Sequence, residues 1–241
     1  MIPKTIHYCW FGNKEKPTTV KKYIENWELY YPDFTIKEWN ESNFNVNTMP
    51  FVKEAYQKEK YAFVSDVARI YALITEGGIY FDTDVLVLKK FPDELLSKPS
   101  FIGFEDDSKV GTAIIASEAN HPFWVEFFNY YQKQHFILDN NILNMTPNVD
   151  ILTNILIKRG LCCTNTHQII EKIYIYPKDY FSPKSYLTGK IKKTINTYTI
   201  HDFAGTWLPQ SPWYVRIEKK VWNSLGLSNK NIISKLIKMI K

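Results

Sequence analysis

Residues 77–88, which read GGIYFDTDVLVL, constrain the fold of this chain more than any other stretch. Two glycines precede an apolar run of the kind found in buried strands, yet the run contains Asp82 and Asp84. A buried strand excludes unpaired charges, so the two carboxylates predict an end or edge of the sheet rather than its middle. Residues i and i+2 of an extended strand point to the same side, which predicts that both carboxylates lie together there.

The segments around this run alternate between strand and helix patterns. Residues 5–11 and 34–39 are predicted as strands, and residues 18–31 between them as an amphipathic helix. Residues 52–76 have a helical period over two segments, with the glycine pair as a stop, and a strand is predicted over 79–91. The order of strand, helix and strand predicts an α/β domain built on a parallel sheet.

Later segments continue the alternation. Further strands are predicted at 100–106, 110–117, 172–177 and 197–209, the last leading into a loop, and further helices at 121–134 and 149–160. The chain has 241 residues, of which 45% are hydrophobic, enough for a substantial core. It contains no repeat, low-complexity tract or linker, so residues 1–227 are predicted to form one domain.

Charge and cysteine content argue against several classes of protein. Thirty Lys and Arg against 25 Asp and Glu give a net charge of +5, but only three are Arg, which argues against a nucleic-acid-binding surface. Cys9, Cys162 and Cys163 form neither a disulfide framework nor a CxxC metal site, and they suit a reducing compartment. There is no signal-peptide pattern and no run of about eighteen apolar residues, so we expect a cytoplasmic chain.

The last segment, residues 228–241, is basic and amphipathic. Its apolar residues fall on one helical face and its lysines on the other: Ile232, Ile233, Leu236, Ile237 and Ile240 against Lys230, Lys235, Lys238 and Lys241. Two alternatives remain for this segment. It either packs on the body as a final helix or contacts an anionic membrane surface.

Two carboxylates held close together repel each other, and either a proton or a cation relieves that repulsion. Mg²⁺ and Mn²⁺ prefer oxygen ligands and keep open positions that hold the phosphates of a nucleotide. Asp82 and Asp84 are therefore candidates for a metal-assisted diphosphate site. Two alternatives remain: a turn stabilised by the aspartate side chains, and a phosphatase nucleophile, for which Leu86 stands where the DxDxT motif has Thr.

Ser65 and Asp66 are predicted to open the helix before this strand, and Arg69 follows within it. Asp66 and Arg69 are three residues apart, so they share a helical face. Such a fork can hold sugar hydroxyls or a phosphate. The alternative is an ordinary surface ion pair, which contributes little to stability.

Three segments together resemble a known family. Residues 63–85, FVSDVARIYALITEGGIYFDTDV, with IPKTIHYCWFG at 2–12 and HDFAGTW at 201–207, resemble the DXD-containing sugar transferases of glycosyltransferase family 32. That group includes bacterial capsular-polysaccharide enzymes, and the pattern is similar to the catalytic domains of clostridial glucosylating toxins. The resemblance implies a GT-A fold, with a single Rossmann-like mixed sheet flanked by helices. It also implies a nucleotide-sugar donor and Mn²⁺ or Mg²⁺ as cofactor.

The resemblance also implies roles for the central residues. By it, Asp84 binds the metal directly, and Asp82 contacts both the donor ribose and the metal shell. Asp66 and Arg69 hold hydroxyls of the donor sugar, and Ser65 helps to shape that edge. Four of these residues, Asp66, Arg69, Asp82 and Asp84, are therefore the expected catalytic residues within the central segment.

The flanking segments supply further expected contacts. Trp10 stands where the family places a Trp against the nucleoside base, with a plain core role as the alternative. His201 matches a late histidine near the metal, with a structural role as the alternative. Thr206 and Trp207 match a Ser-Trp pair whose indole N–H reaches the leaving diphosphate. Thr206 departs from that pattern but keeps the hydroxyl, and Trp207 is expected to act in catalysis.

Residues between 100 and 160 give no secure alignment with the family. Asp106, Asp107 and Asp150 are candidates to face the acceptor, with exposed loop carboxylates as the alternative. Tyr180 and Phe181 are expected to be cleft or core aromatics.

The resemblance predicts a retaining, metal-dependent hexosyltransferase. Retention requires a carboxylate nucleophile or attack on the face from which the leaving group departs. The sequence offers no residue that we place as nucleophile, so front-face transfer is expected, with the leaving phosphate taking the acceptor's proton. A UDP-hexose is the favoured donor, GDP-mannose the next, and a surface-glycan, capsular or lipid-linked saccharide the expected acceptor. The alternative is a module that binds nucleotide sugars without turnover.

Overall fold

The computed structural model describes residues 1–204 of the chain. Contacts divide the chain into two compact units, Met1–Ala204 and Gly205–Lys241, and the first is the one described. Thr206, Trp207 and the basic segment 228–241 therefore lie outside the described residues. The predicted boundary between the domain and this segment stays a prediction.

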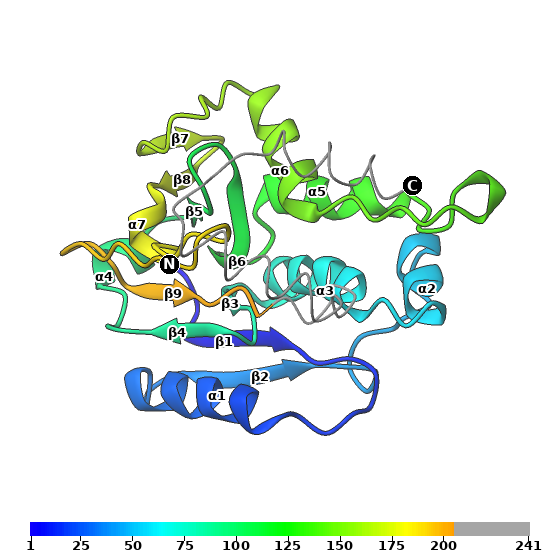
Figure 1. Ribbon diagram of the computed structural model, residues 1–241, viewed down its shortest axis with the longest axis horizontal. Coiled ribbons are helices and arrows are strands. Elements are labelled where there is room, and N and C mark those ends of the chain that lie inside the picture. Colours follow the sequence, from blue (N-terminus) through cyan, green and yellow to red (C-terminus); the bar gives the residue numbers. More distant parts are fainter. Residues whose placement is uncertain (205–241) are drawn as a thin grey trace, which may run out of the picture. The chain divides into compact units, whose positions relative to one another are not determined.

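A seven-stranded mixed sheet forms the centre of the described unit (Figure 1). In spatial order its strands are β2 (Thr35–Trp39), β1 (Thr5–Cys9), β3 (Gly78–Phe81), β6 (Val110–Ser117), β5 (Ser100–Phe104), β8 (Ile173–Tyr176) and β7 (Gln168–Ile170). β1 pairs in parallel with both β2 and β3, as the order of strand, helix and strand requires. β5 and β8 also pair in parallel, whereas β6 runs antiparallel to both β3 and β5, and β7 runs antiparallel to β8. The predicted parallel sheet is therefore a mostly parallel mixed sheet in which β6 and β7 are reversed.

Helices cover both faces of this sheet, which confirms the α/β prediction (Figure 1). One buried cluster packs under α2 (Pro50–Gln57), α3 (Tyr61–Glu76), α5 (Pro122–Gln132) and α6 (Asn148–Ile157), with a short 3-10 turn at Asp139–Asn141. The other packs under α1 (Thr18–Tyr30), α4 (Asp93–Leu96), α7 (Lys178–Phe181) and a two-stranded sheet of β4 (Val85–Val87) and β9 (Thr199–His201). None of the helices in residues 1–204 has the length and apolar character needed to cross a membrane.

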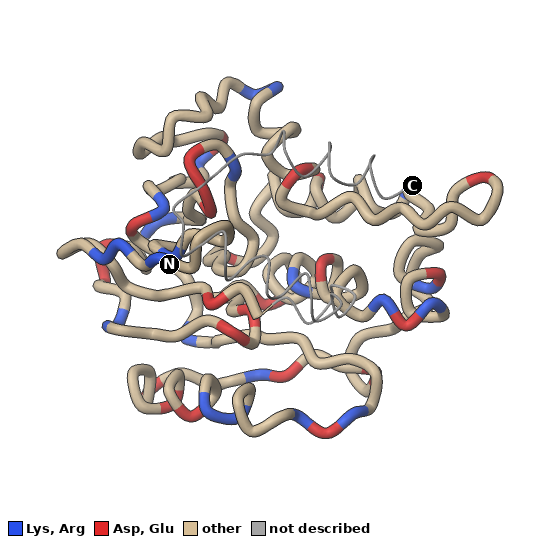
Figure 2. Tube along the Cα trace, in the orientation of Figure 1, with Lys and Arg blue, Asp and Glu red and all other residues tan. Residues whose placement is uncertain are grey.

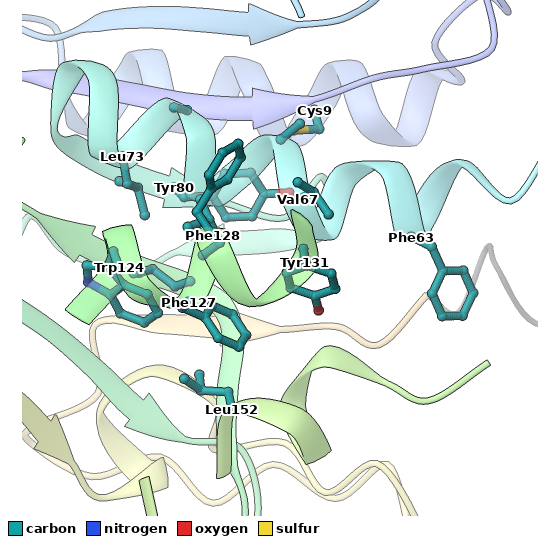
Figure 3. Packing of buried hydrophobic residues seen from close by; sticks show 14 of the residues in the cluster. Cys9, Phe63, Val67, Leu73, Tyr80, Trp124, Phe127, Phe128, Tyr131 and Leu152 are labelled. Atoms are coloured by element: carbon teal, nitrogen blue, oxygen red, sulfur yellow. The ribbon is translucent and has the colours of Figure 1, made fainter. Parts of the chain in front are cut away.

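Aromatic side chains, which make up 16% of the sequence, fill much of the interior. Figure 3 shows Trp124, Phe127 and Tyr131 of α5 in the same cluster as Tyr80 of β3. The indole N–H of Trp124 donates to the hydroxyl of Ser100 (2.9 Å), so the polar atom of this buried ring is satisfied. The sheet is thereby held against α5 from one side.

Gly77 and Gly78 turn the chain from α3 into β3. Both have positive φ, 66° and 112°, which favours glycine. A Cβ on Gly78 would lie 2.6 Å from the carbonyl oxygen of Thr5 and 3.0 Å from Nε2 of His7. The helix stop predicted from the glycine pair is confirmed, and close approach to β1 is the reason the second residue has no side chain.

The strand predicted over residues 79–91 is two strands in two different sheets. β3 ends at Phe81, and β4 begins at Val85 in the small sheet. Between them the N–H of Val85 donates to the carbonyl of Asp82 (3.1 Å), which closes a turn that contains Asp82 and Asp84. Carboxylate side chains favour such turns, and this is why the apolar run breaks here. The turn alternative is therefore correct as geometry, and the same turn presents both carboxylates at the end of β3.

Candidate active site

Hydrogen bonds fix Asp82 at the end of β3. Its N–H donates to the carbonyl of Ala113 on β6 (2.8 Å), so the pairing of β3 with β6 continues one residue beyond the strand. Its Oδ1 accepts a hydrogen bond from the hydroxyl of Tyr80 (2.8 Å) and lies 3.3 Å from Nη2 of Arg69. The carboxylate is therefore held in one orientation by groups from two elements.

His201 reaches the same turn from far along the chain. β9 pairs with β4 so that His201 lies opposite Val85, and the N–H of Asp202 donates to the carbonyl of Asp84 (3.0 Å). Nε2 of His201 lies 3.4 Å from Oδ1 of Asp84. One ligand atom from each of Asp82, Asp84 and His201 lies within 4.8 Å of the other two. The structure thus brings together the three residues predicted as metal ligands.

The chemistry of this group fits a divalent ion. Burial tends to raise the pKa of Asp84, but the hydrogen bond and charge of His201 hold it below its usual value. Burial tends to lower the pKa of His201, but Asp84 raises it on balance. Nδ1 of His201 is buried and has no hydrogen-bond partner among residues 1–204. Two carboxylates that draw a positive charge, beside an imidazole with an unused nitrogen, are a donor set that suits Mn²⁺ or Mg²⁺.

Arg69 ties this group to the helix and sheet behind it. Its side chain is buried, with Nη1 donating to the carbonyl of Thr112 (2.8 Å) and Nε to that of Ser65 (3.3 Å). Nη2 lies 2.8 Å from Oδ1 of Asp66 as well as near Asp82. The surface ion pair alternative is wrong, because the side chains of Arg69 and Asp66 are 6% and 13% exposed. Arg69 therefore positions two carboxylates, and its contact with a donor sugar stays a prediction.

Ser65 and Asp66 lie in the second turn of α3, not at its opening. The helix begins at Tyr61, and the hydroxyl of Ser65 donates back to the carbonyl of Tyr61 (3.0 Å), a common arrangement for serine inside a helix. Burial raises the pKa of Asp66 to about 7, although the charge of Arg69 opposes the shift. A carboxyl group that exchanges a proton near neutral pH can both donate to and accept from a sugar hydroxyl.

Trp10 follows β1 and lines a hollow of about 440 Å³ at the carboxyl ends of β1 and β2. Its indole N–H donates to the carbonyl of Lys14 (2.6 Å), and its ring packs in part against the buried cluster behind the sheet. The other lining residues are polar or charged: Asn13, Lys14, Glu15, Lys16, Lys21, Glu38, Asn40 and Glu41. Open α/β sheets bind ligands outside the carboxyl ends of their strands. Contact between Trp10 and a nucleoside base stays a prediction.

Several residues beside His201 were not predicted from the sequence. The carboxylate of Asp202 accepts hydrogen bonds from the hydroxyl of Tyr23 and from Nζ of Lys184, the latter at 2.7 Å. Phe203 follows with a φ of 53°, and its ring centroid lies 4.0 Å from that of His201. These contacts hold the segment after β9 against α1. In the sequence Asp202 stands out by following His201, whereas no pattern marks Tyr23 or Lys184.

Glu105 is a further carboxylate at this edge of the sheet. It follows β5, and Gly111 on β6 leaves room for it, since a Cβ on Gly111 would lie 3.0 Å from the Cβ of Glu105. Burial raises the pKa of Glu105, while the positive charge of His201 opposes the shift. Like Asp82, it is an acidic residue directly after a buried strand, and that position is the signal that finds it.

The other candidate carboxylates of this region lie at the surface. Asp106 accepts a hydrogen bond from the N–H of Lys109 (2.7 Å) and so closes the loop between β5 and β6. Asp107 pairs with Lys178 and Asp150 with Lys109, each at 2.5 Å. The alternative of exposed loop carboxylates is therefore correct for Asp106 and Asp107, whereas Asp150 lies in the first turn of α6 and is half-buried.

Tyr180 and Phe181 both lie in α7. Phe181 is a core residue, 1% exposed and stacked on Phe101 at a centroid distance of 5.6 Å. Tyr180 packs on Tyr176 at 4.9 Å and is partly buried. The core alternative is therefore correct for Phe181, and Tyr180 borders the same cluster.

Comparison with known sequences identifies the class. Residues 17–102 match a family described as the glycosyltransferase sugar-binding region containing DXD motif, a range that includes Asp66, Arg69, Asp82 and Asp84. The uncharacterized glycosyltransferase L373 of Acanthamoeba polyphaga mimivirus is 29% identical over 200 residues, 77% of each chain. Inositol phosphoceramide mannosyltransferase 3 of Schizosaccharomyces pombe is 27% identical over 142 residues, 54% of this chain and 39% of that protein. The chain thus spans most of the first relative but well under half of the second.

A solved structure agrees in fold. The PaToxG glycosyltransferase superposes with a TM-score of 0.50 at 21% identity, over 66% of this chain and 69% of that one. The predicted GT-A fold, α/β with one mixed sheet flanked by helices, is confirmed. Fold, motif and relatives together define a glycosyltransferase domain. The chain is therefore an enzyme of the glycosyltransferase class, and it carries the sugar-binding region with the DXD motif.

Proposed function

We propose that this chain is a retaining, metal-dependent hexosyltransferase with a nucleotide sugar as donor. The observation that carries the proposal is the group formed by Asp82, Asp84 and His201 at the carboxyl end of β3, with its ligand atoms within 4.8 Å of one another. Two of these residues come from one turn and the third from a strand more than a hundred residues later. The position of this group at the carboxyl end of a strand, where open α/β sheets bind their ligands, supports the proposal.

Asp82, Asp84 and His201 hold Mn²⁺ or Mg²⁺ in this proposal. When bound, the ion supplies positive charge against the negative charge that develops on the departing diphosphate. Contacts within the protein orient the two metal-binding carboxylates before the ion binds. Arg69 and Tyr80 fix Asp82, and the N–H of Ala204 donates to Oδ2 of Asp84 (2.7 Å), which leaves Oδ1 toward His201.

The donor lies along the edge next to this group. We assign the sugar hydroxyls to Asp66 and Arg69, where a carboxyl with a pKa near neutrality is held by a buried guanidinium. The nucleoside base is assigned to Trp10 and the hollow that it lines. Thr206 and Trp207, beyond the described residues, are assigned to the leaving diphosphate because of the HDFAGTW motif.

The finer assignments rest on the resemblance of the three segments to glycosyltransferase family 32, in its bacterial capsular-polysaccharide type. They make a UDP-hexose the favoured donor, with GDP-mannose next. The acceptor is a surface-glycan or lipid-linked saccharide, used in the cytoplasm at the inner membrane face. Transfer occurs on the front face of the sugar, and the leaving phosphate takes the acceptor's proton, which retains the anomeric configuration.

A panel of nucleotide sugars tested for thermal stabilisation, with and without Mn²⁺, examines donor and metal together. We expect one sugar to raise Tm in the presence of Mn²⁺ and EDTA to remove the shift. Asp84→Asn should lose the shift because it removes a ligand, whereas Asp107→Asn, at a surface carboxylate paired with Lys178, should keep it. Equal shifts with and without metal, in both variants, would contradict the proposal.

Donor hydrolysis separates the transferase from a module that binds nucleotide sugars without turnover. A transferase releases nucleoside diphosphate slowly when water takes the place of the acceptor, and we expect Asp84→Asn to abolish that release. Binding with no release in the wild-type protein, and no effect of Asp84→Asn, would favour the binding module.

A further inference from the structure

A hairpin joins α7 to β9, and its surface differs from that of the other loops. Lys184 and Ile191 form an antiparallel bridge, the N–H of Ser185 donates to the carbonyl of Lys190 (2.8 Å), and the N–H of Gly189 donates to that of Ser185 (2.8 Å). We call residues 183–195 the basic hairpin. It lies at the margin of the described unit in Figure 1.

The basic hairpin exposes apolar side chains that a loop in water normally buries or lacks. Tyr186, Leu187, Ile191 and Ile195 are 51%, 64%, 45% and 88% exposed. They are four of the ten large hydrophobic side chains that are exposed among residues 1–204, gathered within ten positions of the sequence. Exposed apolar patches of this kind indicate an interaction surface.

The same hairpin is basic. Residues 183–201 contain four lysines and no Asp or Glu. Lys190, Lys192 and Lys193 are exposed, and among the described residues their ammonium groups form no ion pair or hydrogen bond. Lysines lie along this segment in Figure 2, and the Nζ of Lys89 adds a further cation by donating to the carbonyl of Ile195 (2.5 Å).

We propose that the basic hairpin docks on an anionic membrane surface. Apolar side chains beside unpaired lysines match the two parts of such an interface, the acyl boundary and the phosphate headgroups. A protein partner with an acidic face would satisfy the lysines but leave less reason for aliphatic side chains as exposed as Leu187 and Ile195. The lipid surface satisfies both.

The base of the hairpin contacts the candidate active site. Lys184 pairs with Asp202, and the ring centroid of Tyr186 lies 5.5 Å from that of Phe203, whose ring packs on His201. Docking therefore holds the Asp82, Asp84 and His201 group close to the lipid surface. On the proposed function, this position suits an acceptor saccharide borne on a membrane lipid over one free in solution.

The test uses the full chain, without donor or metal, and co-sedimentation with vesicles of phosphatidylcholine containing phosphatidylglycerol. We expect binding that falls with salt and is absent from pure phosphatidylcholine vesicles. We expect two variants to weaken vesicle binding by about tenfold or more each. One combines Leu187→Ser with Ile191→Ser, and the other changes Lys190, Lys192 and Lys193 to Gln. Vesicle binding needs no donor, so the protein can fail to bind vesicles and still transfer sugar. It can equally bind vesicles and fail to transfer sugar.

Matched controls carry the same changes elsewhere on the surface. One control is Leu29→Ser, at a leucine of α1 that is 75% exposed, and the other changes the exposed Lys22, Lys53 and Lys58 to Gln. Both should leave vesicle binding within about twofold of wild type. Unchanged Tm and donor hydrolysis in the hairpin variants show that the fold is intact. No binding of the wild-type protein to anionic vesicles would overturn the proposal. So would full binding by the hairpin variants, which would assign the contact to another surface such as residues 228–241.

Discussion

Arg69 organises the candidate site from inside the protein. Its guanidinium contacts the carboxylates of Asp66 and Asp82 and the carbonyls of Ser65 and Thr112, so it joins α3, β6 and the end of β3. A buried ion pair is a weak source of stability in itself, but loss of one partner leaves the other charge uncompensated. The sequence indicates the pair through its i,i+3 spacing, and gives no sign of the carbonyl contacts.

Replacement of Arg69 should therefore reduce the free energy of unfolding more than replacement of an arginine nearer the surface. For Arg69→Met we expect a loss of about 3–5 kcal/mol in the free energy of unfolding, because two carboxylates lose their cation. Arg159→Met is the control, since Arg159 pairs with Glu126 and Glu171 near the surface, and we expect about 0–1 kcal/mol. Urea unfolding measures both, and similar losses would contradict the burial argument.

His7 links β1 to the glycine turn in its neutral form. Nδ1 accepts a hydrogen bond from the indole N–H of Trp39 (3.0 Å), so Nε2 carries the proton and donates to the carbonyl of Gly77 (2.7 Å). The imidazole is buried, and burial lowers its pKa below 6.5 although the bond to Gly77 opposes the shift. The unfolded chain therefore binds a proton at a higher pH than the folded one.

This difference predicts a pH dependence of stability. Above the unfolded pKa near 6.5 the His7 contribution is complete, and it is lost as pH falls through the window below that value. Between about pH 7.5 and about pH 5.5, the wild-type protein should lose more unfolding free energy than His7→Gln, which has no proton to gain. Urea unfolding at the two pH values measures the difference, and equal losses would show that His7 is not held neutral.

At the scale of elements, the helices and strands follow from local patterns, whereas the partner of a strand does not. The apolar period predicts α3, and the glycine pair predicts its end, because these signals act within a few residues. The separation of 79–91 into β3 and β4 depends on a different kind of contact. β4 pairs with β9, and Val85 and His201 are opposite each other although far apart in the sequence. No local period encodes such a pairing.

The glycine turn offers a test at this scale. Gly78→Ala places a Cβ 2.6 Å from the carbonyl of Thr5 at a φ of 112°, so both strain and steric contact oppose it. Gly160→Ala is the control, because Gly160 has a φ of 99° with no neighbouring atom within 4 Å. We expect backbone strain to lower the free energy of unfolding by about 1–3 kcal/mol in each variant, and the contact with Thr5 to lower it further in Gly78→Ala. Thermal unfolding compares the two variants. Equal losses of stability would show that β1 shifts to make room for the added Cβ.

The whole described unit joins two sheets at the candidate site. The N–H of Asp202 donates to the carbonyl of Asp84, and that of Ala204 donates to Oδ2 of the same residue. Metal bound to Asp84 and His201 should tighten both contacts, because it links the turn after β3 to β9. Amide hydrogen exchange should then slow at Asp202 and Ala204 when Mn²⁺ is added. Exchange at β7, on the far edge of the central sheet, serves as the control, and an unchanged rate at both amides would count against the link.

Prediction of the site from the sequence succeeded for residues that carry a motif and missed those that only meet in space. Asp82, Asp84 and His201 were expected together and are together. Glu105 and Tyr23 were not expected, since Glu105 lies in a region without a secure alignment and Tyr23 reaches Asp202 from the other end of the chain. The Tyr23 contact depends on the packing of α1 against the small sheet, and the position of Glu105 depends on the pairing of β5 with β6.

The most direct test is an anomalous-scattering map from crystals of the protein grown with Mn²⁺ and a nucleoside diphosphate. The predicted result is a manganese peak coordinated by Asp82, Asp84 and His201, with the diphosphate beside it. A map with no peak between these side chains, while nucleotide occupies another surface, would contradict the central claim.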